Sequence, residues 1–217
     1  QENNADADEA DPISGKTIVW LGSSVTFGDN GYSMAETVAE NHSAVSTYKY
    51  AISGTMLTNT SDSSYVERMK EIDPNIDAFV VQLSTNDATN GMPLGEISDS
   101  DEYDDTTIVG AMETIISYVK STWDCPVVFY TGTYFESDEY QAMVDKLFEL
   151  KDKWDIDVVD LWNNEKLKDM CLSGEINSYM KTKYGTENEP DPIHPNATGY
   201  KELWTPVFEE TLSEILK

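Results

Sequence analysis

The chain has 217 residues, of which 41 are Asp or Glu and only 14 are Lys or Arg, so its formal net charge is −27. This balance disfavours nucleic acid and anionic membrane surfaces as partners, because both bind through basic patches. No apolar run is long enough to span a bilayer, which predicts no membrane insertion. The length suits one sizeable α/β core, and two full domains would be a tight fit.

The first 15 residues are acidic, polar and poor in aliphatic side chains, and they begin with Gln1 rather than Met. Residues 1–15 are therefore predicted to be a flexible leader, and residues 16–217 a single domain. A polar tether behind a trimmed start is typical of a protein whose signal peptide has been removed. We expect an extracellular or surface-attached bacterial protein rather than a cytoplasmic one. The alternative is that the sequence starts at Gln1 only because disordered residues before it were left out.

Five short apolar runs follow along the chain, and they are near-continuous rather than alternating. Such runs are typical of strands that are buried on both faces of a parallel sheet. They are Thr17–Leu21, Tyr48–Ile52, Ala78–Leu83, Val127–Tyr130 and Val158–Trp162.

Helical patterns lie between and after these runs. Residues 106–121 and 137–154 each place apolar side chains on one face, and Ser137 is a candidate N-cap. A third apolar face spans residues 203–216, where Pro206 is expected to break or kink the helix. Strands that alternate with helices predict a three-layer α/β/α sandwich with about five parallel strands.

One long irregular stretch, residues 88–105, follows the third predicted strand and is rich in Asp and Glu. A loop of this length in a compact domain is usually functional or mobile. Its acidic side chains predict a solvated flap near the site.

Small polar residues follow several of the predicted strands. In a parallel sheet, ligands bind outside the carboxyl ends of the strands. The segments at this edge are Gly22-Ser23-Ser24, Ser53-Gly54-Thr55, Ser84-Thr85-Asn86-Asp87, Thr131-Gly132-Thr133 and the later loop Asp191–His194.

The stretch GSSVTFG, residues 22–28, could be an ordinary strand-to-helix turn, a phosphate cradle or the site of a nucleophile. The phosphate interpretation is weak, because the stretch lacks both glycine-rich fingerprints and no Lys or Arg occurs from Thr17 to Tyr48. A nucleophile needs a base, and the chain has only two histidines. His42 lies in a polar segment near a predicted helix end, where a surface or capping role is usual.

His194 is the better candidate base, because Asp191 precedes it by three residues in the segment DPIHPNATGY. On one rigid turn, Asp191 can accept a hydrogen bond from Nδ1 of His194 and leave Nε2 free to act on a serine hydroxyl. The alternative is a helix-capping loop in which Asp191 only caps and His194 has no role.

Acyl transfer also needs hydrogen-bond donors for an oxyanion. Three candidates are the backbone N–H groups of Ser24 and Gly54 and the side-chain amide of Asn86, each after a different strand. Taken singly, Gly54 could only supply a positive φ angle, and Asn86 could only cap a turn. Their occurrence together favours an oxyanion hole.

These segments resemble the SGNH hydrolases of the GDSL esterase/lipase group. GSSVTFG looks like the nucleophile block, SGT (53–55) and STND (84–87) resemble the second and third blocks, and DPIH (191–194) is similar to the last. The four blocks occur in the family's order along nearly the whole chain. The resemblance implies a flavodoxin-like fold, a Ser24–His194–Asp191 triad, and an oxyanion hole made by Ser24, Gly54 and Asn86.

The chain departs from the family pattern at three positions. Ser23 stands where Asp is usual, Val25 where Leu is usual, and Ser84 where a glycine commonly begins the third block. None of these changes removes a catalytic group. Ser23 and Ser24 cannot both point into one cleft, and the alignment of the blocks favours Ser24 as the nucleophile and Ser23 as a turn residue.

The resemblance implies a carboxylic ester hydrolase that needs no metal or organic cofactor. The acidic loop argues against a long-chain lipase, and aromatic residues after the fourth strand (Tyr130, Tyr134 and Phe135) could stack on a sugar, although core packing is their commoner fate. We expect a short acyl group, such as O-acetyl, on a small molecule or saccharide. The alternatives are a lysophospholipase or thioesterase, an acyltransferase, and a non-catalytic carbohydrate-binding surface protein. The sequence does not show the oligomeric state or whether Cys125 pairs with Cys171.

Overall fold

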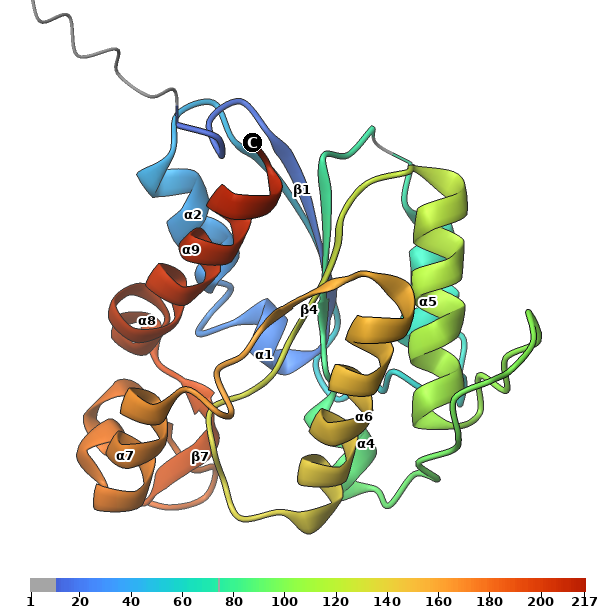
Figure 1. The fold of residues 1–217 in the computed structure, drawn as a ribbon. Helices are drawn as coiled ribbons and strands as arrows, with labels where there is room; N and C mark the ends of the chain where they lie inside the picture. Colours follow the sequence, from blue (N-terminus) through green and yellow to red (C-terminus); the bar gives the residue numbers. More distant parts are fainter. Residues whose placement is uncertain (1–10, 74) are drawn as a thin grey trace, which may run out of the picture.

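The computed structural model describes residues 11–73 and 75–217, and its centre is a five-stranded parallel sheet (Figure 1). The strands lie in the order β2-β1-β3-β4-β5, and every neighbouring pair is parallel. This order is flavodoxin-like, which confirms the predicted fold class. The strands are β1 (Thr17–Gly22), β2 (Ser46–Ala51), β3 (Ala78–Gln82), β4 (Val127–Tyr130) and β5 (Asp157–Val159).

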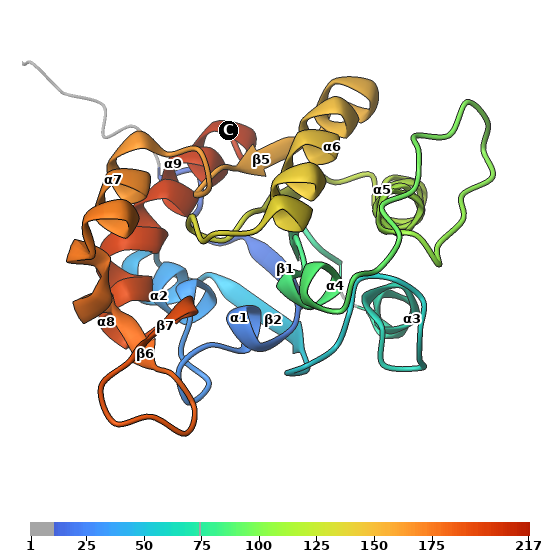
Figure 2. The ribbon, with the colours of Figure 1, turned by 90° about the horizontal axis from the view of Figure 1, so that it is seen from below.

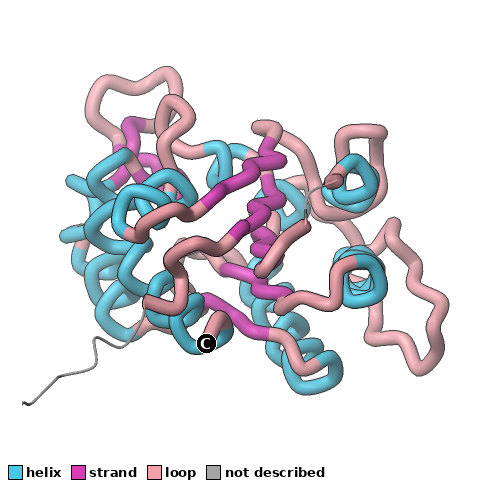
Figure 3. The backbone as a smooth tube through the Cα atoms, turned by 90° about the horizontal axis from the view of Figure 1, so that it is seen from above, coloured by secondary structure: helices cyan, strands magenta, loops and turns pink. Residues whose placement is uncertain are grey.

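Helices cover both faces of the sheet (Figure 3). Alternate residues of β1 show the two cores: Val19 and Leu21 pack with the layer of α5 (Ile108–Thr122) and α6 (Asp138–Trp154). Ile18 and Trp20 pack with the layer of α2 (Met34–Asn41) and α9 (Thr205–Ile215). Among the described residues, no helix combines the length and apolar character needed to cross a membrane.

Short helices follow the carboxyl ends of the strands, and a small antiparallel hairpin lies beside them (Figure 2). The hairpin, which was not predicted from the sequence, pairs β6 (Met180–Thr182) with β7 (Pro190–Pro195). The remaining elements are α1 (Ser24–Phe27), α3 (Tyr65–Arg68), η1 (Met69–Glu71), α4 (Thr85–Thr89), α7 (Glu165–Ser173), η2 (Glu175–Tyr179), α8 (Ala197–Gly199) and the π-helical turn η3 (Tyr200–Trp204).

The predicted helices are present at the expected places. The side chain of Ser137 accepts a hydrogen bond from the N–H of Tyr140 at 3.1 Å, so it caps α6 as predicted. Pro206 lies in the first turn of α9, directly after the π-helical turn. The C-terminal helical stretch is thus divided next to Pro206, where a proline needs no backbone donor.

Two strands differ from their predictions. β2 lies at the edge of the sheet and is partly exposed along its length, so it is not buried on both faces. β5 ends at Val159 instead of reaching Trp162. Beyond it, the hydroxyl of Thr131 accepts the N–H groups of Leu161 and Trp162, each at 2.9 Å. A side chain therefore satisfies the backbone donors that a longer strand would have paired.

The leader was predicted to end too late. Ile13 is fully buried, and the N–H of Gly15 donates to the carbonyl of Ser43 at 2.9 Å. Asp11 lies 2.7 Å from Nδ1 of His42, and hydrogen bonds from Ser14 and His42 lower the pKa of Asp11 to about 2. Residues 11–15 thus belong to the folded part of the chain, and the rest of the predicted leader lies outside the described residues.

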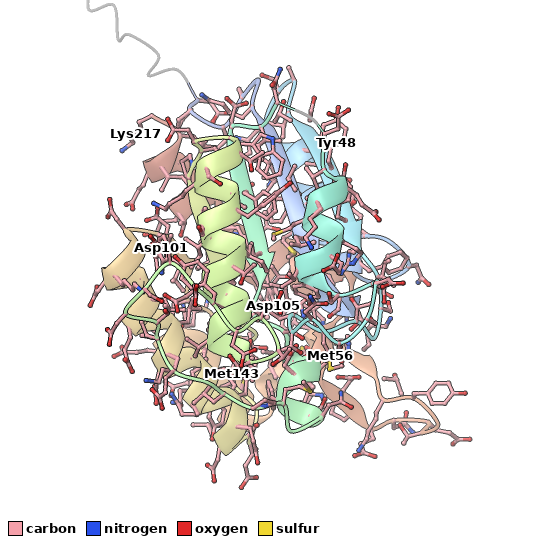
Figure 4. All side chains as sticks on the ribbon, turned by 90° about the vertical axis from the view of Figure 1, so that its right-hand side faces the viewer. Tyr48, Met56, Asp101, Asp105, Met143 and Lys217 are labelled. Carbon is pink, nitrogen blue, oxygen red and sulfur yellow. The ribbon has the colours of Figure 1, made fainter. Side chains whose placement is uncertain are left out.

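The long acidic loop after α4 is anchored to the helical layer on the other side of the molecule from the β6–β7 hairpin (Figures 2 and 4). Its apolar residues Met92, Leu94 and Ile97 pack against the core, while Asp101 is exposed. The buried carboxylate of Glu113 in α5 accepts the N–H of Ser98 at 2.8 Å. The acidic side chains are solvated as predicted, but the loop is not a flap over the site.

Candidate active site

The turn after β1 brings Ser24 to the carboxyl edge of the sheet. A Cβ atom at Gly22 would lie 1.8 Å from Oγ1 of Thr26 and 2.7 Å from Oε1 of Gln82, so this position requires glycine. Ser23 is fully buried, and its N–H donates to Oε1 of Gln82 at 2.9 Å. Ser24 begins α1 and remains partly exposed. Of the two adjacent serines, Ser24 is thus the one available to a substrate.

Ser24, His194 and Asp191 form one hydrogen-bonded chain. Oγ of Ser24 lies 2.8 Å from Nε2 of His194, and Nδ1 of His194 lies 2.9 Å from Oδ2 of Asp191. The nitrogen that faces Ser24 can accept a proton when Asp191 holds the proton on Nδ1. His42 is not part of this group, because its ring contacts Asp11 and Glu209 instead.

The return strand β7 fixes the orientation of this histidine. Oδ1 of Asp191 accepts the N–H groups of Ile193 at 2.8 Å and His194 at 3.0 Å. Burial alone would raise the pKa of Asp191, but the hydrogen bonds from His194 and Ile193 and the nearby imidazole hold it below its usual value. The carboxylate is therefore charged at neutral pH and can stabilise a protonated His194.

The segment after β2 is a tight turn that presents the N–H of Gly54. The N–H of Thr55 donates to the carbonyl of Ile52 at 3.3 Å, and Gly54 has φ of +80° at the third position. This is the geometry of a type II turn, which favours glycine there. Within the described residues, no hydrogen bond takes up the N–H of Ser24 or Gly54, so both donors are free for a ligand.

Helix α4 places Asn86 against the same turn. The side-chain amide of Asn86 donates to the carbonyl of Thr55 at 2.8 Å, which leaves its second N–H group available. Ser84, the residue that replaces the family glycine, is buried and caps α4 by accepting the N–H of Asp87 at 3.4 Å. The structure thus brings the proposed oxyanion donors to one edge of the sheet.

Two buried side chains that support these segments were not predicted from the sequence. Oε1 of Gln82 accepts the N–H of Thr26 at 3.2 Å and its hydroxyl at 2.9 Å, in addition to the N–H of Ser23. The carboxylate of Asp87 accepts the N–H of Leu57 at 2.7 Å and the hydroxyl of Thr58 at 2.7 Å. Asp87 belongs to the STND block, which was the only signal for it in the sequence.

A cleft of about 560 Å³ contains both Ser24 and His194. Phe27 is 43 % exposed beside it, and Tyr184 at the tip of the β6–β7 hairpin is fully exposed. The cleft is lined by Ser24, Phe27, Gly28, Asn30, Ser53, Lys181, Thr182, Tyr184, Asp191, His194 and Tyr200.

Of the three aromatic residues that were considered as a sugar platform, Tyr130 lies in the core, whereas Tyr134 and Phe135 are partly buried and pack against its edge. Tyr130 is fully buried, and its hydroxyl lies 2.6 Å from Oγ1 of Thr26. Tyr134 and Phe135 pack on Trp162, with ring centroids 5.0 and 5.3 Å away. None of the three lines the cleft around Ser24, but Tyr134 and Phe135 line a second pocket of about 210 Å³ that Asp191 also lines.

Cys125 is buried, Cys171 is partly buried, and both are free thiols in the structure. Burial raises the pKa of Cys125 to about 11 and also raises the pKa of Cys171, which disfavours reactive thiolates. Within residues 11–73 and 75–217, no group of three or more His, Cys, Asp or Glu side chains is placed to hold a metal ion.

Comparison with solved structures shows the same fold in several proteins of low sequence identity. A protein from Lactobacillus plantarum has a TM-score of 0.71 and 19 % identity, with 94 % of this chain and 97 % of that chain covered. A member of the lipolytic protein G-D-S-L family from Veillonella parvula has a TM-score of 0.60 and 18 % identity, covering 89 % and 96 %. The acetyl xylan esterase AlAXEase has a TM-score of 0.61 and 16 % identity, covering 90 % and 98 %.

A search of curated proteins finds no match to this chain. By contrast, the family described as "GDSL-like Lipase/Acylhydrolase family" matches residues 20–202, which contain all four sequence blocks. The chain therefore belongs to the GDSL-like lipase/acylhydrolase family and is a carboxylic ester hydrolase.

Proposed function

We propose that the protein hydrolyses esters by a Ser24–His194–Asp191 triad. The observation that carries this proposal is the 2.8 Å contact between Oγ of Ser24 and Nε2 of His194, together with the 2.9 Å contact between His194 and Asp191. His194 takes the proton of Ser24 as the serine oxygen attacks the ester carbonyl. The resulting imidazolium then protonates the leaving alcohol, and an acyl-enzyme remains.

The second half of the reaction uses the same groups. His194 removes a proton from water, which attacks the acyl-enzyme, and the proton returns to Ser24 as the acid leaves. In both halves, the negative oxygen is stabilised by the N–H groups of Ser24 and Gly54 and by the amide of Asn86. The free backbone donors and the turn that holds Asn86 against Thr55 support this assignment.

The substrate that we propose is a short acyl ester, such as O-acetyl, on a carbohydrate. Val25 and Ile193, the neighbours of Ser24 and His194, line an enclosed gap that has no room for a water molecule. This gap therefore offers no interior channel for a long acyl chain. The cleft itself is open, and it combines polar side chains with exposed Phe27 and Tyr184, a mixture suited to a sugar. The structural likeness to an acetyl xylan esterase agrees with this choice.

The test is hydrolysis of 4-nitrophenyl esters of increasing acyl length by the wild type and by Ser24→Ala, followed by acetylated oligosaccharides. We expect activity on the acetate that falls with acyl length and is lost in the variant. A preference for long chains would overturn the short-acyl proposal but keep the nucleophile. Activity that persists in Ser24→Ala would overturn the nucleophile itself.

A further inference from the structure

Arg68, at the end of α3, is only 4 % exposed and lies under the proposed oxyanion hole. Its guanidinium donates four hydrogen bonds. Nη2 donates to the carbonyl of Gly22 at 2.8 Å and to the hydroxyl of Thr55 at 3.0 Å. Nη1 donates to the carbonyl of Tyr50 at 2.5 Å, and Nε donates to the carbonyl of Ser63 at 2.8 Å.

These acceptors belong to the segments that carry the proposed donors. Gly22 is the last residue of β1 and precedes Ser24 by two positions, and Thr55 closes the turn that presents Gly54. Tyr50 lies near the carboxyl end of β2, from which that turn starts. One planar side chain therefore connects the nucleophile turn and the Gly54 turn.

The Gly54 turn needs such a connection, because Ser53 and Gly54 are themselves exposed. Apart from Arg68, the turn is joined to β1 by the N–H of Ile52 on the carbonyl of Gly22, a long contact of 3.3 Å. The backbone carbonyl of Thr55 is also the acceptor for Asn86. A shift of Thr55 would thus move two of the three donors relative to Ser24.

All four partners of Arg68 are uncharged oxygens, so hydrogen bonds rather than an ion pair hold this buried cation. A lysine at position 68 could not make these four hydrogen bonds, because its three donors are on a single nitrogen. The guanidinium instead presents five N–H groups in a rigid plane. The arrangement depends on the shape of the guanidinium as well as on its charge.

We propose that Arg68 is a positioning residue that fixes the Gly54 turn against the Ser24 turn and thereby sets the geometry of the oxyanion hole. This inference rests on the proposed function. Because a displacement of about 1 Å can reduce a rate by about 100-fold, loss of the guanidinium should affect kcat more than KM.

The experiment compares Arg68→Lys and Arg68→Met with the wild type on 4-nitrophenyl acetate. Active sites are counted with a fluorophosphonate, which reacts with the nucleophilic serine. The affinity for a boronic acid is measured as well, because it adds to the serine as a tetrahedral anion that mimics the intermediate. We expect kcat per active site to fall by about 100-fold in Arg68→Met, with KM within about twofold. Boronate affinity should fall in parallel, and Arg68→Lys should not restore either quantity.

Two further variants keep the result interpretable. Thr55→Val removes one acceptor of the guanidinium and also the 2.7 Å hydrogen bond from the Thr55 hydroxyl to the carbonyl of Ile52, with little change in volume. It should lower kcat and boronate affinity even if Arg68→Met fails to fold. Lys153→Met removes a cation that contacts buried Glu113 away from the cleft, so it should lower stability without changing kcat per active site.

The proposal is overturned if Arg68→Lys and Thr55→Val retain wild-type kcat and boronate affinity. It is also overturned if the Arg68 variants lose only active-site number and thermal stability, like Lys153→Met. Failure of the proposed function would appear separately, as persistent activity in Ser24→Ala.

Discussion

The side-chain amide of Asn86 donates to the backbone carbonyl of Thr55 at 2.8 Å and so joins helix α4 to the turn that presents Gly54. The amide is partly exposed at the edge of the sheet, and only one of its two N–H groups is used in this contact. Asn86 is therefore a candidate donor to the oxyanion through its second N–H group, and through this contact it also supports the turn that presents Gly54.

Asn86→Ala should therefore lower kcat by about 10²–10³-fold, the usual loss when one oxyanion donor is removed, while KM changes little. Steady-state kinetics on 4-nitrophenyl acetate measure both quantities. The isosteric variant Asn86→Asp is a stricter test, because it places negative charge beside the developing oxyanion and should be at least as damaging. Near-normal kcat in both variants would remove Asn86 from the oxyanion hole.

Asp191→Asn should lower kcat by about 10³–10⁴-fold, because the amide no longer holds the proton on Nδ1 of His194. The side chain remains similar in size, so loss of packing is not the cause. The rate is measured per active site, counted with a fluorophosphonate. A variant that retained most of its rate would show that His194 does not need Asp191.

The same carboxylate makes a pH-dependent contribution to stability. Hydrogen bonds from His194 and Ile193 lower the pKa of Asp191 despite its burial, so the folded protein binds this proton less readily than the unfolded chain. The resulting stabilisation is fully present above the ordinary pKa of 3.8 and is lost as the pH falls through the lowered folded value. We expect the difference in Tm between wild type and Asp191→Asn to shrink below that pH. A difference that grew on acidification would contradict the assignment.

Gly54→Ala should lower kcat by more than the accompanying loss of thermal stability can explain. No atom would lie within 4 Å of the new Cβ, but φ is +80°, and a side chain in this conformation costs about 1–2 kcal/mol. Relief of this strain would turn the N–H away from Ser24. Gly15→Ala is a matched control, because Gly15 has φ of +78° and equally open surroundings at the N-terminal end of the described chain.

Both variants should lose similar stability in a thermal unfolding experiment, whereas only Gly54→Ala should lose kcat. Equal kinetic losses in the two variants would mean that the N–H of Gly54 is not used.

Glu113→Gln should destabilise the protein by about 1–3 kcal/mol without changing kcat. The fully buried carboxylate accepts Nζ of Lys153 at 2.6 Å, Nε1 of Trp154 at 3.0 Å and the N–H of Ser98 at 2.8 Å. An amide offers only one oxygen to these three donors. Denaturant unfolding and ester hydrolysis are the two measurements. A change in kcat would indicate that the acidic loop communicates with the cleft.

The central sheet could be predicted because three of its strands, β1, β3 and β4, are buried apolar runs, and hydrophobic burial does not depend on details of the surroundings. Ser24, His194 and Asp191, which the structure places in contact, could be proposed as a triad because their chemistry restricts the residue types and because the sequence blocks were in order. The predicted export, bacterial source and single-domain organisation stay predictions.

The β6–β7 hairpin could not be predicted from local preference. β7 contains Pro190, Pro192 and Pro195, and proline cannot donate a backbone hydrogen bond to a strand neighbour. Arg68 was equally hidden, because it lies in a polar stretch in which a cation is expected to face solvent. Only the folded chain shows that the carbonyls of β1 and β2 and the hydroxyl of Thr55 converge on its guanidinium.

The β6–β7 hairpin contributes to the cleft in two ways. Its returning strand holds His194 and Asp191, while Tyr184 in its connecting loop reaches solvent at the mouth of the cleft. We therefore expect that the loop between Lys183 and Glu189, whose backbones pair at 2.7 Å, can be changed in length as long as Met180 still pairs with Pro195. Under the proposed function, directed evolution of this segment is expected to change which alcohols are accepted while His194 and Asp191 keep their positions.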